Sequence, residues 1–303
     1  MVNKIGLLPY TREDLFGITP ETKQITGWEI DKFGIKSLWN KSQGDGVTVA
    51  VIDTGCDINH EDIKNNIIDS INFDNPNQKV NDIAGHGTHV SSTIAAENNG
   101  TGMVGVAPKT KIIAVKALGD NGNGNLNNIA KAIKWAADRK VDFITMSLGS
   151  PYPAQLLESA IDYAASKGCV MFCAAGNSGK NTDIMYPAKY NHTIAIGAIN
   201  ENLDRTDFTC SGDSLDFLAP GYNILGCVPG NKYALMSGTS MSNPFVVGCA
   251  SLLLSYNRKY KKYKLDTVED YINVFKQSAK DLQNKEYKGI KKYQGYGILY
   301  PVL

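Results

Sequence analysis

The sequence predicts an α/β fold in which a mostly parallel central sheet carries helices on both faces. Short apolar, β-branched runs alternate with longer segments of helical periodicity along most of the chain. This alternation is typical of a parallel sheet covered by helices. Two of the apolar runs end close to polar residues, Asp53 and Asn177, as expected where parallel strands present functional groups at their carboxyl ends. Since 43% of the 303 residues are hydrophobic, the chain can bury the substantial core that this fold class requires.

The expected strands are short and apolar. The first of them, Val47–Ile52, consists almost entirely of β-branched and small apolar residues, which predicts a strand buried on both faces of a parallel sheet. Four later runs share its length and composition. In chain order, the predicted strands cover residues 47–52, 111–117, 142–147, 169–175 and 193–199.

The expected helices lie between these strands and after the last one. In the second of them the apolar residues Ile129, Ile133 and Ala136 recur at the spacing of one helical face. The fourth is long and mostly apolar, so we expect it to be buried. In chain order, the predicted helices cover residues 86–97, 126–140, 154–167, 240–256 and 266–280, followed by a closing segment at 295–299.

Composition argues against two classes of partner. The formal net charge is +1, so no electrostatic attraction to nucleic acid or to a membrane surface is indicated. No apolar window is long enough for a transmembrane helix, and the first ten residues contain too short an apolar stretch for a signal peptide. The run Lys259–Lys264 is basic and rich in tyrosine, and we interpret it as an exposed helix end or loop rather than a nucleic-acid site.

The six cysteines are scattered and mostly lie in apolar segments, with no Cys-x-x-Cys motif. Their even number leaves a disulfide framework open as an alternative. Their spacing favours free thiols in a reducing compartment, and we expect the protein in the cytoplasm.

Three short motifs contain an Asp, a His and a Ser in settings that suit peptide-bond hydrolysis. Asp53 ends an apolar run before Thr-Gly, His86 lies in Gly-His-Gly-Thr-His, and Ser240 lies in Gly-Thr-Ser-Met. A serine hydroxyl is a weak nucleophile at neutral pH and needs a base. An imidazole, which titrates near neutrality, can serve as that base, and a carboxylate can fix the tautomer of the imidazole. We expect Ser240 at a helix N-terminus, where free N–H groups favour a developing oxyanion.

Each motif alone has a simpler interpretation. An Asp after a strand is usually a turn or cap residue, and Gly-Thr-Ser is usually a loop or an N-cap. His86 and His89 could be taken for a metal pair, but the His-Glu-x-x-His pattern of metalloproteases is absent. The three motifs together, in the order Asp, His, Ser, resemble the subtilisin family of serine proteases. The resemblance covers residues 46–253 and implies a subtilisin-like three-layer sandwich.

A fourth motif strengthens this resemblance. The run Val170–Gly179 reads as a buried strand that ends in Ala-Ala-Gly-Asn-Ser-Gly. In subtilisins the matching Asn donates its side-chain amide to the oxyanion, which implies this role for Asn177.

The first residues resemble a short extension found in intracellular subtilisins. Leu7-Leu8-Pro9-Tyr10 is similar to the Leu-Ile-Pro-Tyr motif of that group, whose extension lies across the active site until it is removed. The resemblance implies an inhibitory extension over residues 1–23, a catalytic domain over residues 24–303, and a homodimer. A frayed tail is the alternative interpretation of the extension.

Subtilisins bind the substrate as an extra strand between two edge segments. The matching edges here are Gly122-Asn123-Gly124 and Ser147-Leu148-Gly149. The resemblance further implies a first specificity pocket, with Met185 at its floor making it short and apolar. The residues assigned to this pocket are Ala174, Gly176 and Met185.

The Gly- and Asn-rich segment Glu97–Pro108 resembles a calcium-binding loop of the family. Hard oxygen ligands of the kind that Ca²⁺ prefers would come from this loop and from one carboxylate that precedes it. A metal-free turn is the alternative. The implied metal residues are Asp62, Glu97, Asn99, Thr101 and Met103.

Together these observations predict a cytoplasmic serine endopeptidase made as a zymogen, which cleaves peptides or proteins and is inhibited by its own N-terminal segment. A dedicated leader-peptide processing enzyme is an alternative within the same chemistry. A catalytically silent peptide-binding module is the alternative from another class.

Overall fold

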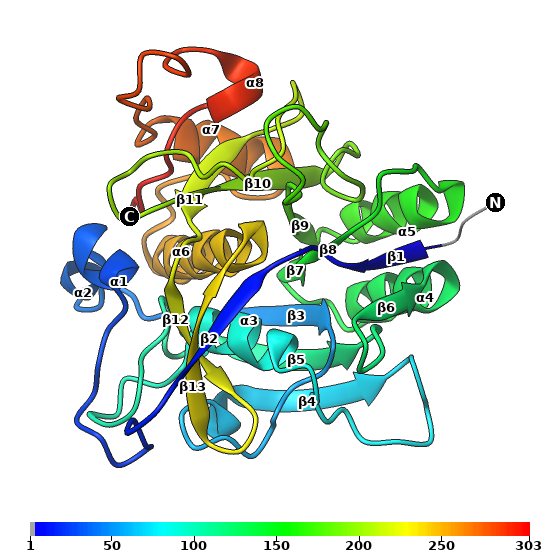
Figure 1. Cartoon of the computed structure of the whole chain (residues 1–303), viewed down its shortest axis with the longest axis vertical. Coiled ribbons are helices and arrows are strands. Elements are labelled where there is room, and N and C mark those ends of the chain that lie inside the picture. The colour runs from blue at the N-terminus through cyan, green and yellow to red at the C-terminus, as the bar shows by residue number, and fades with distance from the viewer. Residues whose placement is uncertain (1–3) are drawn as a thin grey trace.

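We describe the protein from a computed structural model that covers residues 4–303. Its centre is a seven-stranded sheet in the spatial order β11-β10-β9-β7-β3-β5-β4, in which every neighbouring pair is parallel (Figure 1). The predicted mostly parallel sheet is therefore confirmed. In chain order the strands are β3 (Thr48–Asp53), β4 (Ile67–Asn72), β5 (Lys111–Lys116), β7 (Phe143–Met146), β9 (Val170–Ala174), β10 (Thr193–Ile199) and β11 (Phe217–Pro220).

Helices cover both faces of this sheet. One pair packs together against the sheet: α3 (His86–Ala95) and the long α6 (Thr239–Tyr260). A second pair contains α4 (Leu126–Asp138) and α5 (Gln155–Ser166). The remaining helices are α1 (Trp28–Lys32), α2 (Ile35–Leu38), the 3-10 turn η1 (Lys64–Asn66), α7 (Val268–Lys276) and α8 (Lys291–Gln294).

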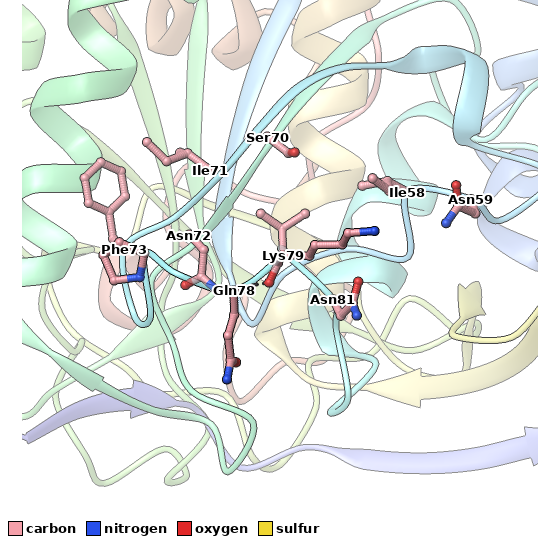
Figure 2. Close-up of a pocket in the computed structure, with 11 residues that line it drawn as sticks. Ile58, Asn59, Ser70, Ile71, Asn72, Phe73, Gln78, Lys79 and Asn81 are labelled. Atoms are coloured by element: carbon pink, nitrogen blue, oxygen red, sulfur yellow. Dashed lines mark hydrogen bonds between the residues drawn. The ribbon is translucent and has the colours of Figure 1, made fainter.

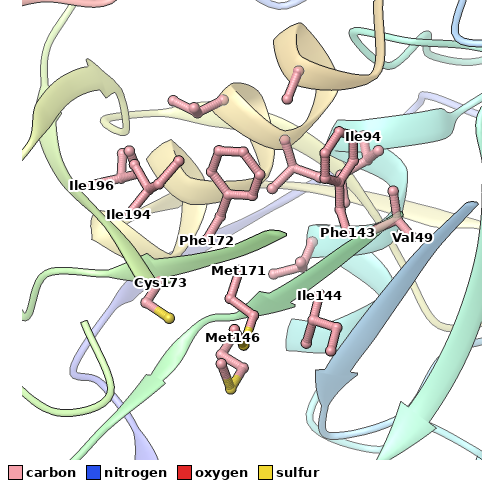
Figure 3. Close-up of a cluster of buried hydrophobic side chains, with 14 of the residues drawn as sticks. Val49, Ile94, Phe143, Ile144, Met146, Met171, Phe172, Cys173, Ile194 and Ile196 are labelled. Atoms are coloured by element: carbon pink, nitrogen blue, oxygen red, sulfur yellow. The ribbon is translucent and has the colours of Figure 1, made fainter. Parts of the chain in front are cut away.

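The core lies between the sheet and these helices. Figure 3 shows side chains of the central strands, among them Phe143 and Phe172, which meet edge to face with ring centroids 5.5 Å apart. Every residue of β9 and β10 is buried, because strands covered on both faces have no solvent side.

The strands predicted at 47–52, 111–117, 142–147, 169–175 and 193–199 are all present, with ends displaced by at most one residue. The predicted helix 266–280 is shorter: α7 begins at Val268, after the capping box of Thr267 and Asp270, and ends at Lys276. The strands β4 and β11 were not predicted from the sequence, because polar residues interrupt the apolar run of β4 and a proline ends that of β11.

Two small antiparallel sheets flank the central one, and each contains part of the N-terminal segment. The first has the order β6-β1-β8, with β1 (Lys4–Leu7) between β6 (Asn123–Asn125) and β8 (Leu148–Gly149). The second has the order β12-β13-β2: β12 (Ile224–Val228), β13 (Lys232–Ser237) and β2 (Thr11–Leu15). In Figure 1, β1 and β2 form a continuous blue strand path across the front of the molecule. Residues 1–3 of the predicted extension lie outside the described residues.

No helix within residues 4–303 is long and apolar enough to span a lipid bilayer. All six cysteines are buried free thiols.

One buried carboxyl group links pH to stability. Glu29 in α1 is 3% exposed, and its Oε2 has no hydrogen-bond partner among the described residues. Burial raises its pKa to about 7, above that of the unfolded chain. Between about pH 4.5 and about pH 7, the carboxyl group of Glu29 is protonated in the folded state and ionised in the unfolded chain. The stability that this proton contributes is therefore lost as the pH rises through that range.

We expect Glu29→Gln to remove this pH dependence and to raise the free energy of unfolding at pH 8 by up to roughly 3 kcal/mol. Urea unfolding at pH 5 and at pH 8 measures the free energy of unfolding of both proteins, and Glu201→Gln, at an exposed position, is the matched control. Equal pH slopes for wild type and Glu29→Gln would contradict this assignment.

Candidate active site

The candidate site lies at the carboxyl ends of three neighbouring strands. Asp53 is the last residue of β3, Ser147 directly follows β7, and Asn177 comes three residues after β9. Since β9, β7 and β3 are adjacent in the sheet, these residues meet at one edge, where α/β sheets usually bind their ligands. The N-termini of α3 and α6 add His86 and Ser240 to the same edge.

Asp53 and His86 form a buried pair. The His86 Nδ1 and Asp53 Oδ1 atoms are 2.7 Å apart, and neither side chain is more than 1% exposed. The backbone N–H of Thr54 also donates to this Asp53 oxygen, at 2.8 Å. Because an ionised carboxylate only accepts hydrogen bonds, the proton of the neutral imidazole belongs on Nδ1. This leaves the lone pair of Nε2 available as a base.

Asp82 positions this pair, and sequence reasoning missed it. Its two carboxylate oxygens accept hydrogen bonds from the hydroxyls of Thr54 and Thr88 and from the N–H groups of Gly85 and Thr88, all at 2.7–2.8 Å. These bonds connect the residue after Asp53 to the first turn of α3, which begins at His86. An Asp shortly before a helix start is a recognisable capping signal, but its bond to Thr54 depends on the fold.

Ser240 is the second residue of α6 and is fully buried. Its hydroxyl donates to the Ser147 carbonyl at 3.3 Å, and the Ser147 hydroxyl donates to the Ser240 carbonyl at 3.0 Å. Within residues 4–303, His86 Nε2 has no hydrogen-bond partner. The ring of Tyr10 lies beside His86, with centroids 5.0 Å apart. The N-terminal segment thus covers the imidazole while the serine hydroxyl bonds elsewhere.

Asn177 directs its amide nitrogen into the cleft. Its Oδ1 accepts hydrogen bonds from the N–H and the hydroxyl of Thr239, at 2.9 and 2.7 Å. This fixes the amide, since the oxygen must face those two donors. The opposite Nδ2 donates to the carbonyl of Pro9 at 2.7 Å. A backbone carbonyl of the N-terminal segment therefore occupies the position next to Asn177 and the start of α6.

The edges predicted to bind substrate hold β1 between them. Ile5 pairs with Gly124, while Gly6 pairs with both Asn123 and Gly149. Leu7 continues the ladder: it pairs with Leu148, and its N–H donates to the Gly122 carbonyl at 2.8 Å. The structure thus places the two predicted edges, 122–124 and 147–149, on either side of the same strand, β1.

Leu8 enters the predicted pocket and is only 2% exposed. A Cβ added to Gly149 would come within 2.7 Å of Leu8 Cδ2 and 3.4 Å of Met185 Cβ. A Cβ on Gly176 would come within 3.0 Å of Met185 Cγ. Gly149 and Gly176 therefore leave the space that Leu8 and Met185 fill. Ala174 is fully buried at the end of β9.

The predicted calcium loop converges on one point. The Gln24 Nε2 lies 2.7, 3.1 and 3.3 Å from the carbonyl oxygens of Glu97, Thr101 and Met103. Three carbonyls around an amide with two hydrogens exceed its donor capacity, whereas such a group of oxygens suits a hard cation. Asp62 lies against the same loop: its Oδ2 accepts from the Met103 N–H at 2.7 Å, and its buried Oδ1 has no partner among the described residues.

These features fit Ca²⁺. Sequence reasoning missed Gln24, whose amide lies among the loop carbonyls and would present its oxygen to a cation there if the amide were turned round. Asn99 lies in the same loop, where its Oδ1 accepts hydrogen bonds from the Thr101 N–H and hydroxyl. Burial raises the pKa of Asp62, as expected for a carboxyl group held away from water.

Comparison with known proteins identifies the family. Residues 44–297 match the family described as the subtilase family (peptidase S8). The chain belongs to the subtilase family. It is therefore a serine endopeptidase of the subtilisin type.

Three relatives illustrate this similarity. The chain is 36% identical to the intracellular serine protease of Paenibacillus polymyxa over 99% of this chain and 91% of the relative. It is 37% identical to the major intracellular serine protease of Bacillus subtilis, over 92% of this chain and 89% of that protein. Subtilisin Savinase of Lederbergia lenta is 40% identical over 80% of this chain and 89% of its own length.

Two other features of this subtilase lie outside the catalytic chemistry. His89 is fully buried, bonds to the Ile224 carbonyl at 2.9 Å, and has its pKa lowered by burial to about 3, so it stays neutral. A groove of about 720 Å³ runs along β4 and the loop after it (Figure 2). Its lining contains no carboxylate, histidine or thiol.

Proposed function

We propose that this subtilase is made as a self-inhibited protease whose own residues 4–15 occupy the cleft. One observation carries the proposal: Asn177 donates its amide to the Pro9 carbonyl, where an oxyanion donor would meet the carbonyl of a scissile bond. The backbone of the segment thus takes the place of a substrate.

In the open enzyme, Asp53, His86 and Ser240 would act as a catalytic triad. The Ser240 hydroxyl attacks the substrate carbonyl, and His86 Nε2 takes the hydroxyl proton. Asp53 stabilises the imidazolium through its bond to Nδ1. Asn177 Nδ2 and the N–H groups at the start of α6 stabilise the oxyanion. His86 then gives the proton to the leaving amine, and water releases the acyl group from Ser240.

The segment would resist cleavage because the residue in the first specificity pocket is not the residue whose carbonyl lies next to Asn177. In a substrate, we expect one residue to place its side chain in the first pocket and its carbonyl next to Asn177. Here Leu8 fills the pocket, while Pro9 presents the carbonyl. The proline ring fixes φ and removes an N–H, which favours this displaced arrangement.

Labelling with a fluorophosphonate tests the protease assignment against a silent binding module. We expect one label per chain, on Ser240, after the N-terminal segment is released from the folded protein, and slower labelling before release. Absence of label in the released form would favour the binding module.

Calcium is part of this proposal. Asp62, Gln24, Asn99 and the carbonyls of the 97–103 loop would hold Ca²⁺, which would fix the loop without taking part in hydrolysis. The three carbonyl oxygens that converge on the Gln24 amide support this site.

We expect a chelator to lower the melting temperature and added Ca²⁺ to restore it, because a ligand that binds only the folded state stabilises it by mass action. Calcium at 100 times its Kd adds about 2.7 kcal/mol. Asp62→Asn should reduce the calcium-dependent shift, and Asp213→Asn, at an exposed position, serves as its control. A melting temperature that does not respond to calcium or chelator, together with no metal by elemental analysis, would argue against the site.

The intracellular names of two relatives and the six free thiols support a cytoplasmic location. The homodimer stays a prediction. Leader-peptide processing is the second candidate, since Met185 beside Gly149 and Gly176 would restrict the first pocket.

A further inference from the structure

The second half of the N-terminal segment occupies a strand edge beyond the catalytic residues. β2 pairs with β13 over five residues, from Thr11 opposite Ser237 to Leu15 opposite Tyr233 (Figure 1). Ser237 lies just before α6, which carries Ser240. The chain therefore runs without a break from the Pro9 carbonyl at Asn177 onto the edge of β13.

The direction of the segment assigns this edge to the leaving-group side. Residues after the carbonyl bound by Asn177 correspond to substrate residues that depart with the amine. If Pro9 marks the scissile position, Tyr10 is the first of them, and the β13 ladder holds the second to the sixth.

Attachment to β13 depends mainly on the backbone. Thr11, Arg12, Glu13 and Asp14 are exposed. Arg12 makes one further bond to the body of the enzyme, to the Ala84 carbonyl at 3.2 Å. A strand held through its main chain accepts many sequences.

The far end of the ladder is apolar. Leu15 and Ile18 pack against a buried cluster around Leu225, Cys227 and Tyr233, together with the partly buried Leu235. Release of the segment would uncover this apolar surface. It would also leave β13 as an edge strand, since within residues 4–303 its other neighbour is β12 alone. Unpaired strand edges readily accept a further strand.

We propose that the β13 edge, Tyr233–Ser237, binds the leaving-group side of the substrate as an added antiparallel strand, with an apolar preference at the sixth residue. The substrate class is an extended, unfolded polypeptide that continues at least six residues beyond the cleaved bond. This inference rests on the proposed function, because the cleft must first be vacated.

The test separates binding from catalysis. A recognition site for an unrelated protease is inserted at Gly17, which is an exposed turn residue with open space around it. The folded full chain carrying Ser240→Ala is cut there, and the Kd of fluorescent peptides is measured. The peptides share their residues before the scissile bond and continue one, three or six residues after it.

We expect the six-residue peptide to bind at least about tenfold more tightly than the one-residue peptide, as two or three net hydrogen bonds would give. N-methylation of alternate leaving-side residues should abolish the gain. Replacing leucine by aspartate at the sixth position should weaken binding to the parent chain, and Leu235→Asp should remove this preference. Lys232→Gln, an exposed change at the start of β13, is the matched control and should leave the preference intact.

A Kd that does not depend on leaving-side length would overturn the proposal. So would a stable dimer of the cut chain, by light scattering, that Leu235→Asp dissociates, since a second copy would then occupy the edge. Failure of the zymogen proposal has a different signature: cutting at Gly17 would leave hydrolysis of the one-residue peptide unchanged in the chain that retains Ser240.

Discussion

Replacing Ser240 by alanine should abolish peptide hydrolysis while leaving the fold intact. Ser240 supplies the hydroxyl that we propose as nucleophile, at the same sheet edge as His86, whose Nε2 has no partner within residues 4–303, and Asn177, whose amide bonds to Pro9. In subtilisin itself, where the effect is known, loss of the nucleophile lowers kcat by about 2 × 10⁶-fold. We expect a loss of the same order here.

The measurement uses the folded chain cut at Gly17, so that occlusion of the cleft does not mask the effect. Ser251→Ala is the control: this serine is buried in the same helix and bonds only to the Val247 carbonyl. Both variants should unfold at temperatures close to that of the parent chain. Hydrolysis by Ser240→Ala, with fluorophosphonate attached elsewhere, would refute the triad.

The sequence was sufficient for the parts of this fold that depend on local pattern. The strands and helices of the central sheet were predictable because burial on both faces gives continuous apolar runs, as in β9. The positions of Asp53 and Asn177 followed, since parallel strands deliver their carboxyl ends to one edge.

The remaining features depend on partners far away in the chain. Gln24 meets the 97–103 loop only after folding, and Asp82 bonds to a threonine 28 residues before it. The strand β2 is mostly charged and exposed, so nothing in its own pattern predicts a strand. It forms because β13 offers an edge that it can complete.

Release of the N-terminal segment should raise activity on small peptides by roughly 100-fold. A tethered segment has an effective concentration near 1 mM, so an intrinsic Kd of about 10 μM would leave only ~1% of the clefts open. Its contacts make such an affinity reasonable: β1 lies between two edges, Leu8 is buried in the pocket, and Pro9 bonds to Asn177.

Activity is compared before and after cutting the folded chain at Gly17, at equal concentrations of active sites titrated with an irreversible inhibitor. In the uncut chain, Leu8→Asp should raise peptide hydrolysis. It places a charge in an apolar pocket, which weakens binding of the segment and leaves more clefts open. Glu13→Gln is the matched control, since Glu13 lies exposed in the same segment without a side-chain bond to the enzyme body.

The variant Pro9→Ala tests whether the segment resists cleavage because proline holds its carbonyl one residue away from the residue in the pocket. Without the ring, the chain can shift so that Leu8 supplies both the pocket side chain and the carbonyl, and the segment becomes a substrate. Mass spectrometry should then detect cleavage between residues 8 and 9 within the folded protein, which the parent chain resists. If cut and uncut chains hydrolyse small peptides at the same rate, the segment does not block the cleft. If the Pro9→Ala chain is not cleaved, the displaced register of the segment is not what protects it from cleavage.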